Sequence, residues 1–254
     1  MKSPLKAKPL RNPGESVDHQ INDLIYDSLL SYLFMAGTFL IIALLEWIRW
    51  YKNAPPKPLL YTIVAMVACL IAAWKYRKTR SKVKSLKLGR DGQKAVGQYL
   101  ELLREKGAKV FHDVPGKDFN VDHVVIHETG IYVVETKMLS KPDRGEAKLL
   151  FNGETVLKNG LAPDRNPIEQ VSAAKSWLIQ LLKESTGKRF SARAVLVYPG
   201  WYIERTAEAK NSDVWVLNPK ALPGFISHSD NQISPEDVNL CAFHLGRYIR
   251  NIES

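Results

Sequence analysis

Residues 119–137 decide the fold, and they read FNVDHVVIHETGIYVVETK. Two runs rich in β-branched and aromatic residues flank a short polar segment, a pattern that predicts a β-hairpin. A turn centred on Glu128 and Thr129 places Asp122 directly opposite Glu135 on the neighbouring strand. A one-residue bulge at the glycine after the turn would shift this register, so the pairing of the two carboxylates depends on a regular turn.

The polar side chains of this hairpin gather on one face, because successive residues of a strand point to opposite faces. Lys137 and Asn120 share a face with Asp122 and Glu135. One interpretation is a solvated hairpin face that carries a surface ion pair. The other is a site in which the carboxylates bind a hard divalent cation such as Mg²⁺. The lysine then lies near the activated water or the developing phosphate charge, as phosphodiester hydrolysis requires.

The order Asp122, then Glu135-Thr136-Lys137 after one hairpin, resembles the Asp…(Asp/Glu)-x-Lys signature of the restriction-endonuclease-like nucleases. Further stretches resemble one branch of that group, the nuclease-related domain (NERD) family. These stretches are residues 89–93 (GRDGQ), which open a helix, 121–125 (VDHVV), 130–137 (GIYVVETK) and 166–170 (NPIEQ). The resemblance extends over residues 88–217, about half of the chain.

The resemblance implies an α/β fold, a restriction-endonuclease-like core with a central mixed β-sheet flanked by helices. It also implies Mg²⁺-dependent hydrolysis of phosphodiester bonds in DNA, with Mn²⁺ as a substitute. Asp122 and Glu135 would hold the metal together with the backbone carbonyl of Thr136. Lys137 would orient or help to deprotonate the attacking water, and Gln170 would lie near the catalytic hairpin. On spacing alone, Gln170 is merely a polar residue in the first turn of a helix.

Gln93 departs from the family pattern, in which a glutamate here contributes a third acidic group. An amide offers a neutral oxygen to a metal but cannot act as a base or neutralise charge. We expect Gln93 to be a supporting polar group of the site. The departure keeps two alternatives open. One is a catalytically weak or inactive nuclease fold that binds nucleic acid or protein at the membrane. The other is a structural membrane adaptor whose hairpin carboxylates form a surface salt bridge.

The positive charge of the chain is confined to its first third. The 254 residues carry a formal net charge of +10. Before residue 91 there are 15 Lys and Arg against 5 Asp and Glu, and from residue 91 onward there are 21 of each. The excess lies next to apolar segments, so it indicates membrane topology more than a nucleic-acid surface. The 2 cysteines provide neither a disulfide framework nor zinc-binding spacing.

Two segments are apolar: residues 29–48 have the length that a helix needs to cross a bilayer, and residues 59–74 fall slightly short of it. Residues 49–58 contain three prolines, which predict a turn. We therefore expect a transmembrane helical hairpin over residues 29–76; a buried or interfacial helix pair is the alternative. Lys and Arg number eight after the second segment and four before the first, against three between them. This asymmetry predicts the cell inner membrane, with both termini and the nuclease-like domain in the cytoplasm.

Four parts of the chain are expected from these patterns. They are a basic tail over residues 1–28, flexible to residue 16; the hairpin over residues 29–76; a basic juxtamembrane linker over residues 77–87; and the nuclease-like domain over residues 88–254. His123 should point away from Asp122 as a structural histidine. The Asn152-Gly153 pair predicts a second hairpin. Arg144, Lys148 and Lys158 either meet phosphates or are ordinary surface charges.

Overall fold

The computed structural model describes residues 10–53, 57–141 and 146–252, which divide into two compact units. One unit comprises Met1–Glu15 and Gly89–Ser254, and the other comprises Ser16–Leu88. The helices are α1 (Glu15–Asp23), the π-helical η1 (Leu24–Leu30), α2 (Ser31–Tyr51), α3 (Pro58–Arg104), α4 (Pro167–Thr186), the 3-10 helix η2 (Glu208–Asn211), α5 (Leu222–Ser227) and α6 (Pro235–Ile252). The strands are β1 (Lys109–Pro115), β2 (Asn120–His127), β3 (Gly130–Thr136), β4 (Lys148–Phe151), β5 (Val156–Leu157), β6 (Ala192–Val197), β7 (Tyr202–Arg205) and β8 (Val214–Leu217).

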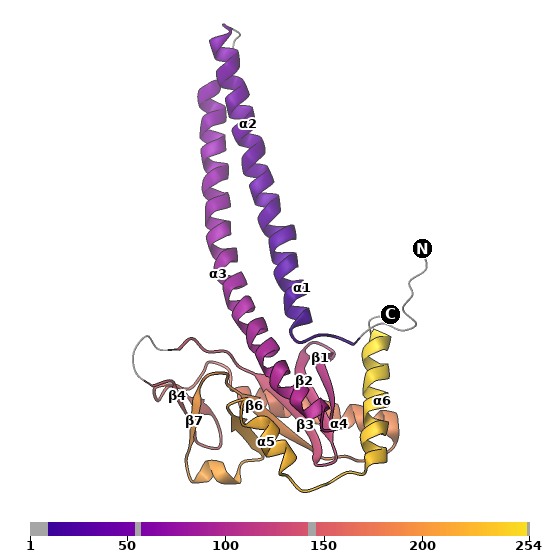
Figure 1. Cartoon of the computed structure of the whole chain (residues 1–254). Coiled ribbons are helices and arrows are strands. Elements are labelled where there is room, and N and C mark those ends of the chain that lie inside the picture. The colour runs from indigo at the N-terminus through magenta and orange to yellow at the C-terminus, as the bar shows by residue number, and fades with distance from the viewer. Residues whose placement is uncertain (1–9, 54–56, 142–145, 253–254) are drawn as a thin grey trace. The chain divides into compact units, whose positions relative to one another are not determined.

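The centre of the larger unit is a five-stranded mixed sheet with the order β1-β2-β3-β6-β8 (Figure 1). Strands β1, β2 and β3 are antiparallel, whereas β6 and β8 continue the sheet in parallel with β3. The parallel strands are joined through helices and longer loops, as parallel neighbours require. The expected α/β fold with a central mixed sheet is therefore confirmed.

The β2–β3 hairpin has the predicted register. His127 pairs with Gly130 and His123 with Val134, around a turn at Glu128 and Thr129. No bulge interrupts these pairs, so the register continues toward Asp122 and Glu135 at the open end of the hairpin.

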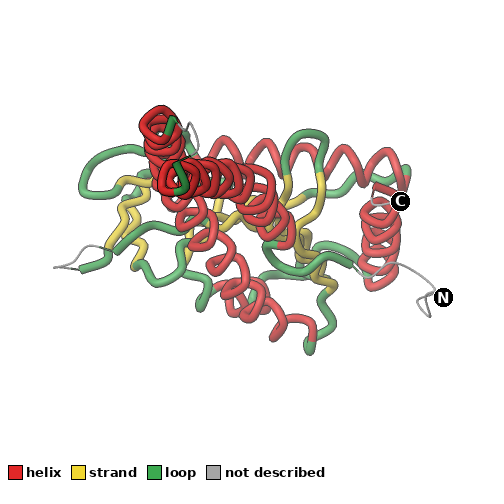
Figure 2. Tube along the Cα trace, turned by 90° about the horizontal axis from the view of Figure 1, so that it is seen from above, coloured by secondary structure: helices red, strands yellow, loops and turns green. Residues whose placement is uncertain are grey.

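Helices cover both faces of this sheet (Figure 2). The side chains of successive strand residues alternate between the two faces. On β3, Ile131 and Val133 face the core shared with α4 and α6, while Tyr132 and Val134 face the core shared with α3 and α5. The same alternation directs Glu135 toward α4. Helix α4 begins where the sequence predicts, because the side chain of its N-cap residue accepts a hydrogen bond from the helix backbone.

A second sheet of three strands has the order β5-β4-β7. The predicted hairpin at Asn152-Gly153 is present, with β4 and β5 antiparallel and Phe151 opposite Val156. The Asn152 side chain accepts hydrogen bonds from the backbone amides of Glu154 and Thr155, which closes the turn. Strand β7, which the sequence patterns did not predict, pairs in parallel with β4.

The N-terminal segment differs from the expected flexible tail over residues 10–15. Leu10 packs against the main core, and Arg11 donates to Asp113. A side chain at Gly97 of α3 would meet the ring of Pro13, which shows how closely this segment lies against the helix. These contacts join residues more than eighty positions apart, so no local pattern could predict them. Most of the basic residues of the tail lie outside the described residues.

Two helical stretches, over residues 15–51 and 59–104, are long and apolar enough to cross a membrane. Trp47 on α2 donates to the hydroxyl of Thr62 on α3 over 3.0 Å. Glu46, the acidic residue of the first apolar segment, accepts from Arg49 and from the backbone amide of Lys57. The carboxylate is thus satisfied by the turn region, part of which lies outside the described residues.

The expected linker over residues 77–87 is helical and forms part of α3, which runs without interruption from Pro58 to Arg104. The basic residues of this stretch are good helix formers, and no proline or glycine interrupts them. The composition predicted a linker because the sequence changes from apolar to strongly basic at the start of this stretch. A charge boundary does not by itself end a helix.

Candidate functional site

Asp122 lies near the start of β2 and is 7% exposed. The backbone amide of Thr136 donates to its Oδ2 over 2.7 Å, and Nε2 of Gln93 donates to its Oδ1 over 2.6 Å. The first donor comes from the neighbouring strand and the second from α3. The carboxylate is thereby fixed between the sheet and a helix that covers the opposite face.

Gln93 reaches this carboxylate because α3 approaches the end of β3 closely. A side chain at Gly92 would overlap that of Met138, so glycine permits the approach. The Oε1 atom of Gln93 is buried without a hydrogen-bond partner and faces Gly14. As placed, Gln93 serves Asp122 as a hydrogen-bond donor and not as an additional metal ligand.

Glu135 lies near the end of β3 and is 5% exposed. Nζ of Lys137 and Nε2 of Gln170 each lie 2.8 Å from its Oε1. Lys137 also donates to Oε1 of Gln170 over 2.7 Å. Three hydrogen bonds therefore join Glu135, Lys137 and Gln170, and the glutamine in the first turn of α4 holds both the carboxylate and the ammonium group in place.

Burial opposes the negative charge of this site. It raises the pKa of Asp122 well above its usual value, and the charge of Glu135 raises it further. Burial also raises the pKa of Glu135, while Lys137 opposes that rise. The site thus contains two carboxylates whose ionisation a single lysine only partly compensates, and an added cation would relieve this.

The donor set fits a hard divalent cation that retains several waters. Asp122 and Glu135 offer carboxylate oxygens, and the hydroxyl of Thr136 is buried without a hydrogen-bond partner. Mg²⁺ is commonly bound by one or two carboxylates together with waters and substrate phosphate. Across residues 10–53, 57–141 and 146–252 there is no group of three or more His, Cys, Asp or Glu able to hold a metal. A metal here would therefore depend on the two carboxylates.

A further acidic residue, Asp113, lies close enough for its charge to raise the pKa of Asp122. It is buried, and its backbone has a φ of 49°, which is uncommon for a residue other than glycine. Asn120 donates to its Oδ1 over 3.1 Å and Arg11 to its Oδ2 over 3.4 Å. The sequence patterns missed Asp113, because only this distorted backbone and the docked N-terminal segment define its position.

His123 points away from Asp122, as predicted, and is fully buried. Its Nδ1 lies 2.8 Å from Nδ1 of His112, and the two rings meet edge to face. Burial lowers the pKa of both histidines. This pair lies on the α3 side of the sheet and is a structural contact, not a part of the carboxylate cluster.

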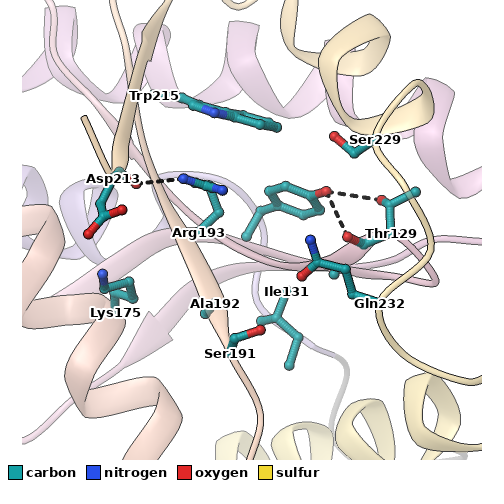
Figure 3. A pocket seen from close by; sticks show the side chains of 12 residues that line it. Thr129, Ile131, Lys175, Ser191, Ala192, Arg193, Asp213, Trp215, Ser229 and Gln232 are labelled. Carbon is teal, nitrogen blue, oxygen red and sulfur yellow. Dashed lines mark hydrogen bonds between the residues drawn. The ribbon is translucent and has the colours of Figure 1, made fainter. Parts of the chain in front are cut away.

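A polar cavity of about 260 Å³ lies at the other end of β3 and β6 (Figure 3). Arg193 stacks on Trp215 there and donates to the backbone oxygen of Asp213 over 3.3 Å. Lys175, which follows Gln170 by five residues on α4, lines this remote cavity. None of the six predicted site residues lines it.

Arg144, one of the three residues considered as phosphate contacts, lies outside the described residues.

The structure brings all six predicted residues into one neighbourhood: Gln93, Asp122, Glu135, Thr136, Lys137 and Gln170. They come from α3, β2, the end of β3 and α4. The sequence also gave no signal for Tyr198, a buried residue whose pKa is raised by burial and by the charge of Glu135. Tyr198 directly follows β6, where a tyrosine after an apolar strand resembles an ordinary core residue.

The chain was compared with protein families, curated proteins and solved structures. The family model described as "Nuclease-related domain" matches residues 88–199. No curated protein matches the chain. Among solved structures, SfsA from Pyrococcus furiosus in complex with Ca²⁺ is 20% identical, with a TM-score of 0.25. The match covers 49% of this chain and 52% of that one, so this chain spans about half of the SfsA length.

Proposed function

Since residues 88–199 belong to the nuclease-related domain family, we propose that the chain is a membrane-anchored nuclease that hydrolyses phosphodiester bonds in DNA with the help of Mg²⁺. The observation that carries the proposal is the buried pair Asp122 and Glu135 at one strand end, with Nζ of Lys137 2.8 Å from Glu135. A purely structural ion pair gains little from a second buried carboxylate, whereas phosphodiester hydrolysis needs this arrangement.

Each residue has a defined part in the proposed reaction. Asp122, Glu135 and the carbonyl of Thr136 would hold Mg²⁺, which when bound neutralises phosphate charge and lowers the pKa of a coordinated water. Lys137 directs its ammonium toward the attacking water or the phosphate oxygens. Gln170 fixes the position of Lys137, and Mn²⁺ suits the same oxygen donors.

Cleavage assays of the full-length chain in mild detergent test the proposal. Supercoiled and linear DNA are incubated with Mg²⁺, Mn²⁺ or chelator. We expect metal-dependent cutting that falls about a hundredfold or more in Lys137→Ala and in Asp122→Asn. Lys175→Ala is the matched control, since that lysine lies on α4 in the remote cavity. Cutting at the wild-type level in Asp122→Asn would overturn the proposal.

One observation favours a second function. Gln93 supplies an N–H to Asp122, where the family pattern has a glutamate, so the site lacks a third carboxylate. A catalytically inactive domain that binds nucleic acid or protein at the membrane would tolerate this change. Tight DNA binding without metal-dependent cutting would favour the binding module.

For anchoring, we propose that α2 and the first half of α3 span the cell inner membrane, with both termini and the nuclease-related domain in the cytoplasm. Large apolar side chains are exposed along both helices, including Phe34, Ile41, Leu44, Leu60 and Leu70. The basic residues after Trp74 suit a cytoplasmic, anionic surface. Protease should digest the domain in inside-out vesicles and leave it intact in right-side-out vesicles; the reverse pattern would refute this orientation.

A further inference from the structure

A cavity of about 400 Å³ adjoins the carboxylate site. It lies among residues 137–139, which follow β3, the loop over residues 158–165, and Tyr198. Lys137 lines this cavity and also contacts Glu135. Whatever occupies the cavity therefore lies beside the proposed reaction centre.

The lining of this cavity has a distinct chemistry. Its walls are mostly apolar, and Leu161 is 75% exposed at its edge. Three cationic residues, Lys137, Lys158 and Arg165, line it, and no acidic residue does so among the described residues. Lys158 is held by the carbonyl of Ser140, whereas Arg165 has no hydrogen-bond or ion-pair partner in the described part of the chain. An occupant with an apolar body and negative charge would complement this lining.

A neighbouring hollow indicates on which side of the cavity the phosphates of a bound strand would lie. It shares Pro163 and Arg165 with the first cavity but is also lined by Asp164 and Glu169. These carboxylates disfavour a phosphate chain on that side. A bound strand would therefore place its phosphates along Arg165, Lys158 and Lys137, on the side of the apolar cavity.

The charge of the domain argues against extensive duplex contacts. From residue 91 onward, basic and acidic residues are equal in number at 21 each. Duplex binding depends on neutralising many phosphates over a broad surface. A small apolar cavity with three adjacent cations suits one nucleotide instead, and a base exposes its apolar faces only when it is unpaired.

We propose that this cavity binds an unpaired nucleotide next to the cleavage point, so that the preferred substrate is single-stranded DNA or DNA with a single-stranded flap. The base would lie against Leu161, Pro163 and Val156, and the phosphates would contact Arg165 and Lys158. The inference rests on the proposed nuclease function for its biological meaning, but binding can be measured without cleavage.

The test uses the full-length chain in detergent, with a fluorescent single-stranded oligothymidylate and a blunt duplex of equal length. Fluorescence anisotropy with chelator present measures binding, and gel assays with Mg²⁺ measure cutting. We expect at least about tenfold tighter binding of the single strand. Leu161→Glu and Arg165→Ala should each weaken single-strand binding about tenfold and leave duplex binding unchanged. Leu161 and Arg165 are exposed, so neither change threatens folding.

Arg189→Ala is the control, because Arg189 is exposed and lies outside the cavity. Selective single-strand binding without cutting would support this inference while refuting the nuclease function. Cutting of duplex and single strand with equal efficiency, or normal single-strand binding in both variants, would overturn the inference while leaving the nuclease function intact. Absence of single-strand binding would also overturn it.

Discussion

The carboxamide nitrogen of Gln93 lies 2.6 Å from Oδ1 of Asp122, so a neutral donor on α3 holds a carboxylate on β2. The backbone amide of Thr136, at the end of β3, donates to the other oxygen of Asp122. The hydrogen bond orders Asp122 and stabilises its ionised form, but adds no negative charge for a metal. This relationship makes the site testable by changing one atom of Gln93.

Gln93→Glu should strengthen metal binding and lower the stability of the metal-free protein. A carboxylate beside Asp122 adds repulsion in a buried place, which a divalent cation relieves. We expect at least a several-fold tighter affinity for Mn²⁺ by calorimetry and a lower Tm with chelator. Gln98→Glu, on the exposed side of the same helix, is the control. Unchanged affinity would show that position 93 does not influence the metal site.

Asp122→Asn should stabilise the metal-free protein, increasingly so as the pH rises. The folded pKa of Asp122 is raised, so the folded state binds more protons than the unfolded state above the usual pKa of about 4, and stability falls as the pH rises through the folded pKa. Each unit of that difference corresponds to about 1.4 kcal/mol. Asparagine does not ionise, so the variant avoids this loss of stability at high pH. The side-chain oxygen of Gln93 can then accept a hydrogen bond from the new amide group.

Thermal unfolding with chelator at pH 5 and pH 8 measures this effect. Mg²⁺ should then raise the Tm of the wild type and not that of Asp122→Asn, since a ligand stabilises the state that binds it. A variant that is less stable than wild type at pH 8, or that Mg²⁺ stabilises equally, would contradict the prediction.

The His112–His123 pair should make the domain sensitive to acid. Burial lowers the folded pKa of both residues below the unfolded value of about 6.5. The unfolded state then binds more protons as the pH falls below that value, so the contribution to stability is complete above it and declines toward acid. His112→Gln keeps a hydrogen-bonding partner for His123 but does not titrate.

Urea unfolding at pH 7.5 and pH 5.5 compares the two proteins. The wild type should lose more stability between these pH values than His112→Gln. His228→Gln changes an exposed histidine and should keep the wild-type pH dependence. Equal acid sensitivity in wild type and His112→Gln would show that the pair does not contribute.

Gln170→Ala should slow catalysis through Lys137 and Glu135, because it removes the hydrogen bonds that hold both groups. We expect kcat to fall about tenfold with KM nearly unchanged, since a positioning residue acts mainly on the reaction step. The pH profile should shift as well, because Glu135 loses a donor to its ionised form. A change in KM alone would assign Gln170 to substrate binding.

The sequence predicted the hairpin and its register because a two-residue turn and period-two alternation are local properties. The capping pattern at Asn166 predicted the start of α4, whereas only the family resemblance predicted that Gln170 lies near the hairpin. Asp113 escaped prediction, because neither its left-handed backbone nor its contacts with Arg11 and Asn120 follow from a sequence pattern. The position of the N-terminal segment also escaped prediction, because it depends on contacts between residues far apart in the sequence.

The docking of residues 10–15 changes how the chain is divided. The larger unit contains chain from both before and after Ser16–Leu88. The apolar hairpin is therefore an insertion within a domain and not an extension in front of it. A side chain at Gly14 would meet Arg90, so the two ends of the insertion are neighbours. A fragment that starts after the hairpin discards a piece of its own domain. Excision of the insertion, with Glu15 spliced to Gly89 by a short linker, retains every element that surrounds Asp122.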